Sequence, residues 1–457
     1  MKPVLLLDVV GLTPRQIDPE RTPHLAALGQ RGALSPMSAV LPAVTCSAQA
    51  TMLTGALPSQ HGAVGNGWRD PASYDVALWR QSNHLVDGEK IYEAARRRDS
   101  SFTCAKLFWW WNMGAAVDRS ITPRPFYFAD GKKEVAIYAT PTEFGVEAER
   151  ELGSFPFFDF WGPKAGLPSS RWIADAAIRT LREYRPTLTM AYLPHLDYDH
   201  QRYGPADERS VQALRDIDAI VGDLVAAADE AGAAVVVVSE YGIREVSRPV
   251  HVNRALRDAG LLRVRETPHG DVLDVFASDA FALADHQIAH VYCQGPRAIA
   301  AATEVLEGLD GVAEVLDDEG KRSAGVDHPR AGQLVALSEP DAWFTYYYWS
   351  DRTSEPDFAR TVDIHRKPGY DPVEMFVDPS LRSPQLRVAQ RLAQKKLGFR
   401  YLVDVIPLDA TLVRGSHGLV PDDPLDGPVW VSSLPLDDAG PIAMTSVKDR
   451  VLAALDR

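Results

Sequence analysis

The run AAVVVVSEYG constrains the fold more than any other stretch of this sequence. Its four valines, Val235–Val238, are apolar at every position, which is typical of a strand covered on both faces. An amphipathic segment over 208–232 comes directly before it and is expected to be a helix. The same order occurs upstream, where a predicted helix over 169–184 precedes the apolar run PTLTMAYLP. Strands that alternate with helices predict an α/β fold with a mostly parallel sheet between helices.

Acidic residues follow three of the predicted strands. Asp8 follows the first strand, Val4–Leu7, and Asp197 and Glu240 follow two later ones. The carboxyl ends of parallel strands lie at one edge of a sheet, where ligands bind. Any one of these acids alone would be interpreted as a loop residue or a helix cap. Three acids with the same placement favour a functional site.

Residues 271–344 have a different pattern, in which IAHVYC, AIAAATEVLEGLDG, VAEVLDD and QLVALSE predict strand, helix, strand and strand. We interpret this segment as a small α+β cap inserted into a core formed by 1–270 and 345–457. A stretch between Phe108 and Pro163 is rich in aromatic residues and is expected to be a packed layer, a pocket wall or both. Lys106, next to it, is either a solvated residue or a contact for a substrate anion.

The chain is acidic. Its 457 residues include 48 Lys and Arg against 62 Asp and Glu, a formal net charge of −14. Such a chain gains nothing from counterion release on a nucleic-acid duplex, so we expect no partner of that kind. The three cysteines are too few and too far apart for a disulfide framework or a thiolate metal site.

The beginning of the chain and its hydropathy bear on location. The segment MKPVLLLDVVG resembles a signal peptide, but its apolar run is short and Asp8 interrupts it. No stretch reaches the roughly 18 apolar residues that a membrane span needs. We therefore expect a cytoplasmic protein with no membrane partner. The oligomeric state cannot be predicted from the sequence.

The segment LPAVTCSAQATMLTGALPSQHGAVGN, residues 41–66, places Thr45 in front of an expected helix. A threonine there is either a helix cap or a nucleophile. A nucleophilic hydroxyl needs a base or a metal ion to lose its proton. The acids at the strand ends and nearby histidines supply oxygen and nitrogen donors that suit zinc, with manganese or iron as alternatives.

Several blocks together resemble the alkaline phosphatase superfamily, in its type I phosphodiesterase/nucleotide pyrophosphatase branch. VTCSAQATMLTGALPSQHGAVGN is similar to the family's nucleophile block in order and spacing. The opening strand, HLDYDHQRYGP, VVVVSEYGI and RGSHG are similar to its metal-binding blocks. The resemblance implies an alkaline-phosphatase-like fold, Thr45 as the nucleophile, and Asn66 as a hydrogen-bond donor to a phosphate oxygen.

The resemblance also implies two divalent metal ions, for which we expect zinc. One is held by Asp197, a following histidine and His417. The other is held by Asp8, Thr45 and the pair Glu240-Tyr241, which stands where the family has Asp-His.

A second departure from the family pattern concerns spacing. The family has a histidine four residues after its Asp, but Gln201 is at that position here, and His200 is three residues after Asp197. We expect His200 to be the ligand, with Asp199 also within reach. His365 is a further candidate as a metal ligand or phosphate donor, and a surface turn is the equal alternative for it.

The sequence therefore predicts a metal-dependent hydrolase of a phosphodiester or pyrophosphate bond in a small-molecule substrate. Thr45 would form a phosphothreonine intermediate. Two alternatives stay open. One is hydrolysis of a phosphomonoester, phosphonate or sulfate ester on the same site. The other is a non-catalytic binding protein with a degenerate metal site, for which Glu240-Tyr241 is the best evidence.

Overall fold

A mixed β-sheet is the centre of the first of two structural units. The computed structural model describes residues 1–129, 132–436 and 440–457. Unit 1 comprises residues 1–63, 81–243 and 420–457, and unit 2 comprises residues 64–80 and 244–419.

The sheet of unit 1 has nine strands among the described residues, in the order β23-β2-β22-β11-β1-β10-β5-β6-β9. Their bounds are β1 Val4–Val9, β2 Ala33–Ser38, β5 Cys104–Leu107, β6 Arg119–Pro123, β9 Ile137–Thr140, β10 Leu188–Leu193, β11 Ala234–Val238, β22 Val429–Ser432 and β23 Ile442–Ala443. The five strands from β11 to β6 run parallel, which confirms the predicted parallel sheet. Antiparallel pairs at both sides, β22 with β11 and β9 with β6, were not predicted.

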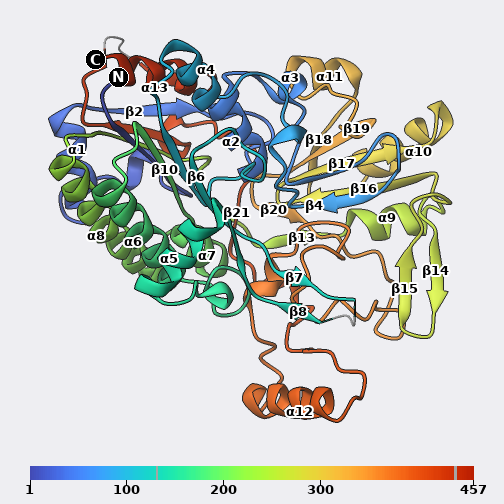
Figure 1. Ribbon diagram of the computed structural model, residues 1–457. Coiled ribbons are helices and arrows are strands. Elements are labelled where there is room, and N and C mark those ends of the chain that lie inside the picture. Colours follow the sequence, from blue (N-terminus) through green and yellow to red (C-terminus); the bar gives the residue numbers. More distant parts are fainter. Residues whose placement is uncertain (130–131, 437–439) are drawn as a thin grey trace. The chain divides into compact units, whose positions relative to one another are not determined.

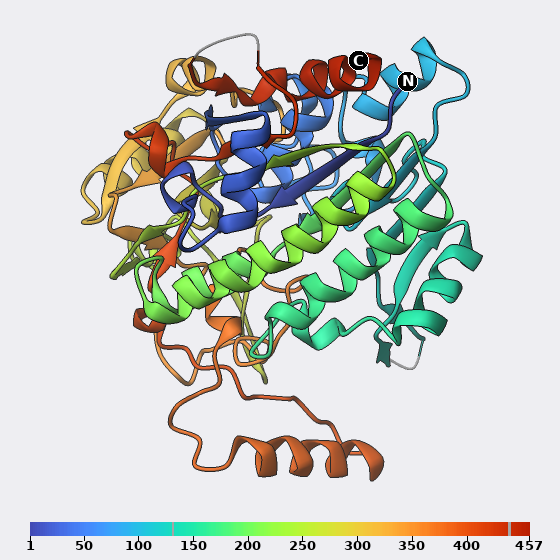
Figure 2. The same cartoon turned by 90° about the vertical axis from the view of Figure 1, so that its left-hand side faces the viewer.

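Helices cover both faces of this sheet, as predicted. On one face α8 and α6 run side by side, with α1 next to α8 (Figure 2). On the other face α13 packs against α2 and α4 (Figure 1). The bounds of the helices of unit 1 are α1 Pro23–Arg31, α2 Thr45–Thr54, α3 Pro58–His61, α4 Ile91–Arg98, α5 Thr142–Leu152, α6 Leu167–Glu183, α7 His195–Tyr203, α8 Glu208–Glu230 and α13 Val447–Asp456. A short hairpin, β7 Phe126–Tyr127 with β8 Lys133–Glu134, also belongs to this unit.

A four-stranded antiparallel sheet forms the centre of unit 2, again counting only described residues, in the order β16-β17-β19-β18. The strands are β16 Ala280–Asp285, β17 Ile288–Cys293, β18 Val312–Leu316 and β19 Leu334–Ser338, and α10 Pro296–Glu307 precedes β18. The predicted strand, helix, strand and strand of residues 271–344 are therefore all present. The strand β16, which forms a hairpin with β17, was not predicted.

The rest of unit 2 consists of short elements. They are β3 Gly67–Arg69, β4 Val76–Leu78, β12 Arg244–Glu245, β13 Arg248–Val250, β14 Val264–Thr267, β15 Gly270–Leu273, β20 Ala342–Phe344, β21 Gly415–Ser416, α9 Val252–Asp258, α11 Asp318–Ser323 and α12 Pro384–Lys396. Residues 271–344 thus share a unit with residues on both sides of them and with 64–80. Their role as a cap stays a prediction. In the described part of the chain, no helix combines the length and the apolar character that crossing a membrane requires.

Lys106 is buried in β5, and it does not lie at a surface where an anion could reach it. Its Nζ donates a hydrogen bond to the Trp111 carbonyl oxygen at 2.7 Å and lies above the Tyr92 ring. Burial lowers the pKa of Lys106 from 10.5 to about 7. Arg124, the other basic residue beside the aromatic stretch, is exposed.

Lys106 makes the stability of unit 1 depend on pH. Because its folded-state pKa is about 7 and its unfolded value 10.5, the unfolded chain binds the extra proton between these values, and the free energy of unfolding rises with pH. The Lys106→Met variant lacks this contribution. The difference in the free energy of unfolding between wild type and variant therefore changes with pH, by at most about 1.4 kcal/mol per pH unit. Urea unfolding at several pH values measures the difference. A difference that does not change with pH contradicts the prediction.

Candidate active site

Thr45 is the first residue of α2, and Val44, in an extended conformation, is the N-cap. The threonine is therefore not the cap, which was the simpler interpretation of its position. Its side chain is 4% exposed, and its Oγ1 lies 3.2 Å from the Tyr241 hydroxyl oxygen. Since the first N–H groups of a helix have no partners within it, the hydroxyl lies at the positive end of α2.

A chain of hydrogen bonds runs from Thr45 through Tyr241 to Asp197. The Tyr241 hydroxyl donates to Asp197 Oδ1 at 3.3 Å, and Gln201 Nε2 donates to Asp197 Oδ2 at 2.8 Å. A tyrosine hydroxyl has one proton. Because Tyr241 gives that proton to Asp197, the Tyr241 oxygen accepts the proton of Thr45. The Thr45 oxygen therefore accepts no hydrogen bond from Tyr241.

Asp8 and Glu240 form a buried pair of carboxyl groups beside this chain. Strands β1 and β11 are parallel neighbours, with Asp8 opposite Val238 and Glu240 two residues further on. Both side chains are 0% exposed. Asp8 Oδ1 and Glu240 Oε2 have no hydrogen-bond partner among the described residues. Two buried carboxyl groups this close cannot both be ionised without a proton or a cation to compensate their charges.

Gln49 holds the pair together. It lies on α2 one turn after Thr45, and its Nε2 donates to Asp8 Oδ2 at 3.1 Å and to Glu240 Oε1 at 2.7 Å. Its Oε1 accepts a hydrogen bond from the Trp110 backbone N–H at 2.6 Å. Our reading of the sequence did not include Gln49, although its spacing of four from Thr45 on one helix face was a usable signal.

The aromatic run Trp109–Trp111 supports α2 from its neighbouring loop. The three side chains are at most 5% exposed, so they form a packed layer. Trp111 Nε1 donates to the Cys46 carbonyl oxygen at 3.0 Å, one residue after Thr45. Together with the bond from Trp110 to Gln49, this contact fixes the first turn of α2.

Burial controls the charge states in this cluster. Burial and the nearby Glu240 charge raise the pKa of Asp8 well above its ordinary value. Burial also raises the pKa of Glu240 to about 7 and that of Asp197 to about 6. The pKa of Tyr241 is raised well above 10 by burial, so its hydroxyl keeps its proton at neutral pH.

His200 and Asp199 do not share the hydrogen bonds of Asp197. His200 Nδ1 is buried and has no hydrogen-bond partner among the described residues, and burial lowers the pKa of His200 to about 3. Asp199 forms an ion pair with Arg202 at 3.1 Å. On α7 it is Gln201, one full turn after Asp197, that contacts the carboxylate.

Asn66, in unit 2, is held by Asp285. The Asn66 backbone N–H donates to Asp285 Oδ2 at 2.8 Å, and Nδ2 donates to Oδ1 at 3.0 Å. Asp285 is fully buried, and burial raises its pKa to about 6. Our sequence reading missed Asp285, because nothing local in the sequence links it to a residue 219 positions earlier.

The other predicted ligands in unit 2 are His417 and His365. The His417 ring lies tilted against His286, with the ring centres 3.6 Å apart, and His286 stacks on Tyr370 at 3.8 Å. His365 is exposed. Unit 2 thus buries His417 among rings and leaves His365 at the surface.

The donor set decides which metal ion the site fits. Across the described residues, no three His, Cys, Asp or Glu side chains gather into a group that could hold a metal ion. Asp8 Oδ1 and Glu240 Oε2 are nevertheless buried without partners, next to the hydroxyls of Thr45 and Tyr241. These oxygen atoms fit one hard divalent cation such as Mg²⁺ or Mn²⁺. Both Asp197 oxygens accept hydrogen bonds, and Asp197 as a ligand of a second ion stays a prediction.

Comparison with known proteins gives one family match and several structural matches. Residues 4–371 match the family model described as type I phosphodiesterase / nucleotide pyrophosphatase. A phosphonoacetate hydrolase from Sinorhizobium meliloti 1021, solved with phosphonoformate, has a TM-score of 0.62 at 16% identity, covering 99% of this chain and 96% of that one.

Murine ectonucleotide pyrophosphatase/phosphodiesterase 5, solved as an inactive variant with AMP, has a TM-score of 0.59 at 13% identity. That match covers 100% of this chain and 95% of the murine one. The human protein of the same name has a TM-score of 0.57 at 13% identity, with the same coverage. No curated protein matches the sequence.

Replacement of Gln49 tests whether it holds the carboxyl pair. Gln49→Leu keeps the approximate size but removes the hydrogen bonds of Gln49 to Asp8, to Glu240 and from the Trp110 N–H. The free energy of unfolding should fall by about 2–4 kcal/mol, measured by urea unfolding. Gln212→Leu is the matched control, because Gln212 also donates to an aspartate but is exposed on α8, and it should change stability by less than about 0.5 kcal/mol. Equal stability of the two variants contradicts the bridging role.

Proposed function

Because the chain belongs to the type I phosphodiesterase/nucleotide pyrophosphatase family, we propose that it hydrolyses a phosphodiester or pyrophosphate bond in a small molecule. Thr45 is the nucleophile and forms a phosphothreonine intermediate. The observation that carries the proposal is the Thr45 hydroxyl, which is buried at the start of α2 and hydrogen-bonded to Tyr241 beside the Asp8–Glu240 pair.

The hydrogen bonds orient the nucleophile and give its proton a route. Thr45 Oγ attacks phosphorus while the bond from phosphorus to the leaving oxygen breaks. The Thr45 proton passes to the Tyr241 oxygen, and the Tyr241 proton passes to Asp197 Oδ1 along the existing hydrogen bonds. The N-terminal N–H groups of α2 favour negative charge on the phosphoryl oxygens. Water then attacks phosphorus, and the bond from phosphorus to the Thr45 oxygen breaks. Asp197 returns its proton to Tyr241 and Tyr241 returns one to the Thr45 oxygen, while the proton lost by the attacking water leaves with the phosphate product or to solvent.

Asp8, Glu240 and Thr45 are the residues that would hold a metal ion in unit 1. A divalent cation bound there supplies Lewis-acid stabilisation of the negative charge that develops on the reacting oxygens. Gln49 keeps the two carboxyl groups turned toward each other. We propose that the site holds one hard divalent ion such as Mg²⁺ or Mn²⁺. The family resemblance implies instead two ions, both zinc. Asn66 as a donor to a phosphate oxygen stays a prediction, and its Nδ2 has a second proton beyond the one given to Asp285.

The nucleophile is tested with a substrate panel and with mass spectrometry. Thr45→Ala should lower kcat for phosphodiester or pyrophosphate substrates by about 10³-fold or more, whereas Thr45→Ser keeps a hydroxyl and part of the activity. Acid-quenched wild-type enzyme should carry the transferred phosphoryl group on the peptide that contains Thr45. Thr54→Ala, at the other end of α2, is the control and should keep full activity.

The panel also separates the alternatives. Turnover only of a phosphomonoester, a phosphonate or a sulfate ester overturns the proposed bond specificity. No turnover of any member by folded protein supplied with Mg²⁺, Mn²⁺ or Zn²⁺ overturns the enzymatic proposal and favours a binding protein.

The metal is tested by direct binding. Dialysed protein should bind a single Mn²⁺ per chain, measured by equilibrium dialysis and electron paramagnetic resonance. Asp8→Asn should weaken this binding by more than about a hundredfold, because it removes a ligand. Asp197→Asn should leave the number of bound ions unchanged. Two ions bound by the wild type, or one ion lost from Asp197→Asn, would show that the family's pair of metal ions is present.

A further inference from the structure

Helix α12, Pro384–Lys396, has an unusual environment within unit 2. None of its 13 residues is buried. In Figure 1 the helix, drawn in orange, stands at the end of an extended arm of the chain, apart from the other helices of unit 2, and the second view agrees (Figure 2). A helix this short and this exposed has few contacts to hold it, so its surface is expected to have a partner.

One side of α12 and of the turn that follows is apolar. The large apolar side chains are strongly exposed, with values of 70% for Leu386, 47% for Leu392, 73% for Leu397 and 64% for Phe399. Leu386, Ala389, Ala393 and Leu397 are spaced by three or four residues, which places them on one helix face. Exposed leucines occur singly on most proteins, but a face of them on one helix indicates an interaction surface.

The same segment is strongly basic. Residues 382–400 contain six Lys or Arg residues and no Asp or Glu, although the whole chain has a net charge of −14. The six are Arg382, Arg387, Arg391, Lys395, Lys396 and Arg400. This local excess of positive charge makes the segment complementary to an anionic surface.

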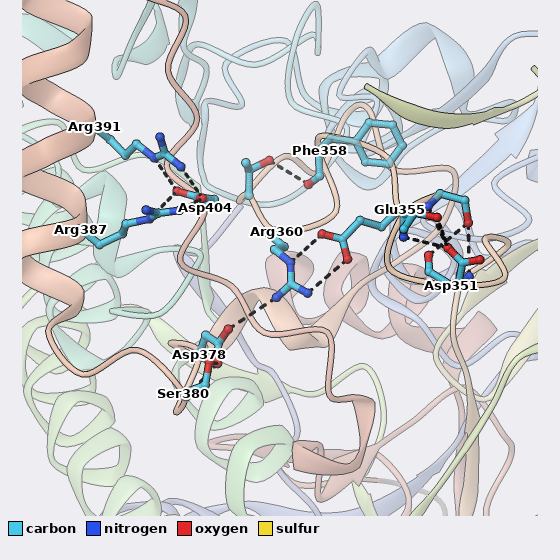
Figure 3. A network of polar contacts seen from close by, with 12 residues as sticks. Asp351, Glu355, Phe358, Arg360, Asp378, Ser380, Arg387, Arg391 and Asp404 are labelled. Atoms are coloured by element: carbon cyan, nitrogen blue, oxygen red, sulfur yellow. Dashed lines mark hydrogen bonds and ion pairs between the residues drawn. The ribbon is translucent and has the colours of Figure 1, made fainter. Parts of the chain in front are cut away.

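Two of the arginines fix which side of α12 faces its own chain. Arg387 and Arg391 both donate to Asp404 on the returning segment, the latter at 2.6 Å (Figure 3). The base of the arm is tied by Arg360, which pairs with Glu355 at 2.8 Å and with Asp378 at 3.5 Å. These pairs hold the arginine side of α12 toward the chain, so the apolar side with Leu386 and Leu397 is turned to solvent.

We propose that α12 binds the surface of an anionic phospholipid bilayer. The helix lies in the plane of the headgroups, with Leu386, Leu392 and Leu397 among the acyl chains. At 1.5 Å per residue it is about 20 Å long, too short to cross the roughly 30 Å hydrocarbon core. An exposed basic helix with one apolar face is the sequence pattern of such surface binding.

The position of Lys396 favours a bilayer over a protein partner. It follows Leu392 by four residues and Ala393 by three, so it lies on the apolar face itself. Lysine is depleted from the centres of protein interfaces. At a bilayer, a lysine in that place extends its ammonium group to the headgroups while its carbon chain stays with the apolar side chains. This proposal departs from the expectation of no membrane partner, which was based on the lack of a segment long enough to span a bilayer.

The proposal is tested with the full chain and vesicles. The chain should co-sediment with vesicles of phosphatidylcholine containing phosphatidylglycerol and not with vesicles of phosphatidylcholine alone, and added salt should weaken the binding. Leu386→Glu combined with Leu397→Glu, and separately Lys395→Glu combined with Lys396→Glu, should each lower vesicle binding by about tenfold or more.

Matched controls carry the same changes elsewhere on the surface. Val146→Glu on α5 and Arg322→Glu on α11 also alter exposed residues and should bind vesicles as the wild type does. Because α12 has no buried side chain, its variants should keep the wild-type urea midpoint. No binding to anionic vesicles overturns the proposal, as does an equal loss in the controls. A dimer that Leu386→Glu dissociates, without vesicle binding, would identify a second copy of the chain as the partner instead.

Discussion

The bridge that Gln49 makes between Asp8 and Glu240 is the interaction on which the rest of the candidate site depends. Two carboxyl groups with no exposed surface lie at the ends of neighbouring parallel strands, and one amide donates to both. The same amide accepts from the Trp110 backbone, so the sheet, α2 and the aromatic run are joined through one side chain. Thr45 is one helical turn from that side chain, and its position therefore follows from the bridge. The buried Trp110 and Trp111 hold α2 in this position through their hydrogen bonds to Gln49 and Cys46.

The departures from the family pattern are coupled to one another. Tyr241, where the family has His, donates to Asp197 and accepts from Thr45. Gln201, where the family again has His, donates to the other oxygen of the same carboxylate. A histidine ring at either position would offer a nitrogen to a cation, whereas a phenol and an amide offer protons to Asp197. The two residues thus act on one carboxylate together, and Asp197 accepts one hydrogen bond from each of them.

Local patterns in the sequence predicted the parallel strands, the helices that correspond to α6 and α8, and the family, all of which are confirmed. Those features depend on periodicity and on a contiguous nucleophile block, which a sequence displays directly. Gln49 and Asp285 were missed because their partners are 191 and 219 residues away, and only the folded chain brings them together. Strand β22, which lies between β2 and β11, was missed for the same reason, since its partner β11 is distant in sequence. The hydrogen bond from Gln201 to Asp197 was also not predicted, and His200 as a metal ligand stays a prediction.

The charge of the chain bears on how α12 could meet a membrane. An acidic protein is repelled by an anionic surface, and the repulsion of exposed charges extends over about 8 Å at physiological salt. The chain outside 382–400 is more acidic than the whole, since that segment holds six cations and no anion. Attraction is therefore confined to one short helix, and the remaining surface resists contact. Helix α12 reconciles the two forces, because exposed leucines and cations lie together on a segment that carries no Asp or Glu. Three of the six cations pair with acids of the same chain, Arg387 and Arg391 with Asp404 and Arg400 with Asp357. Of the six, Arg382, Lys395 and Lys396 are therefore the ones that would face the lipid.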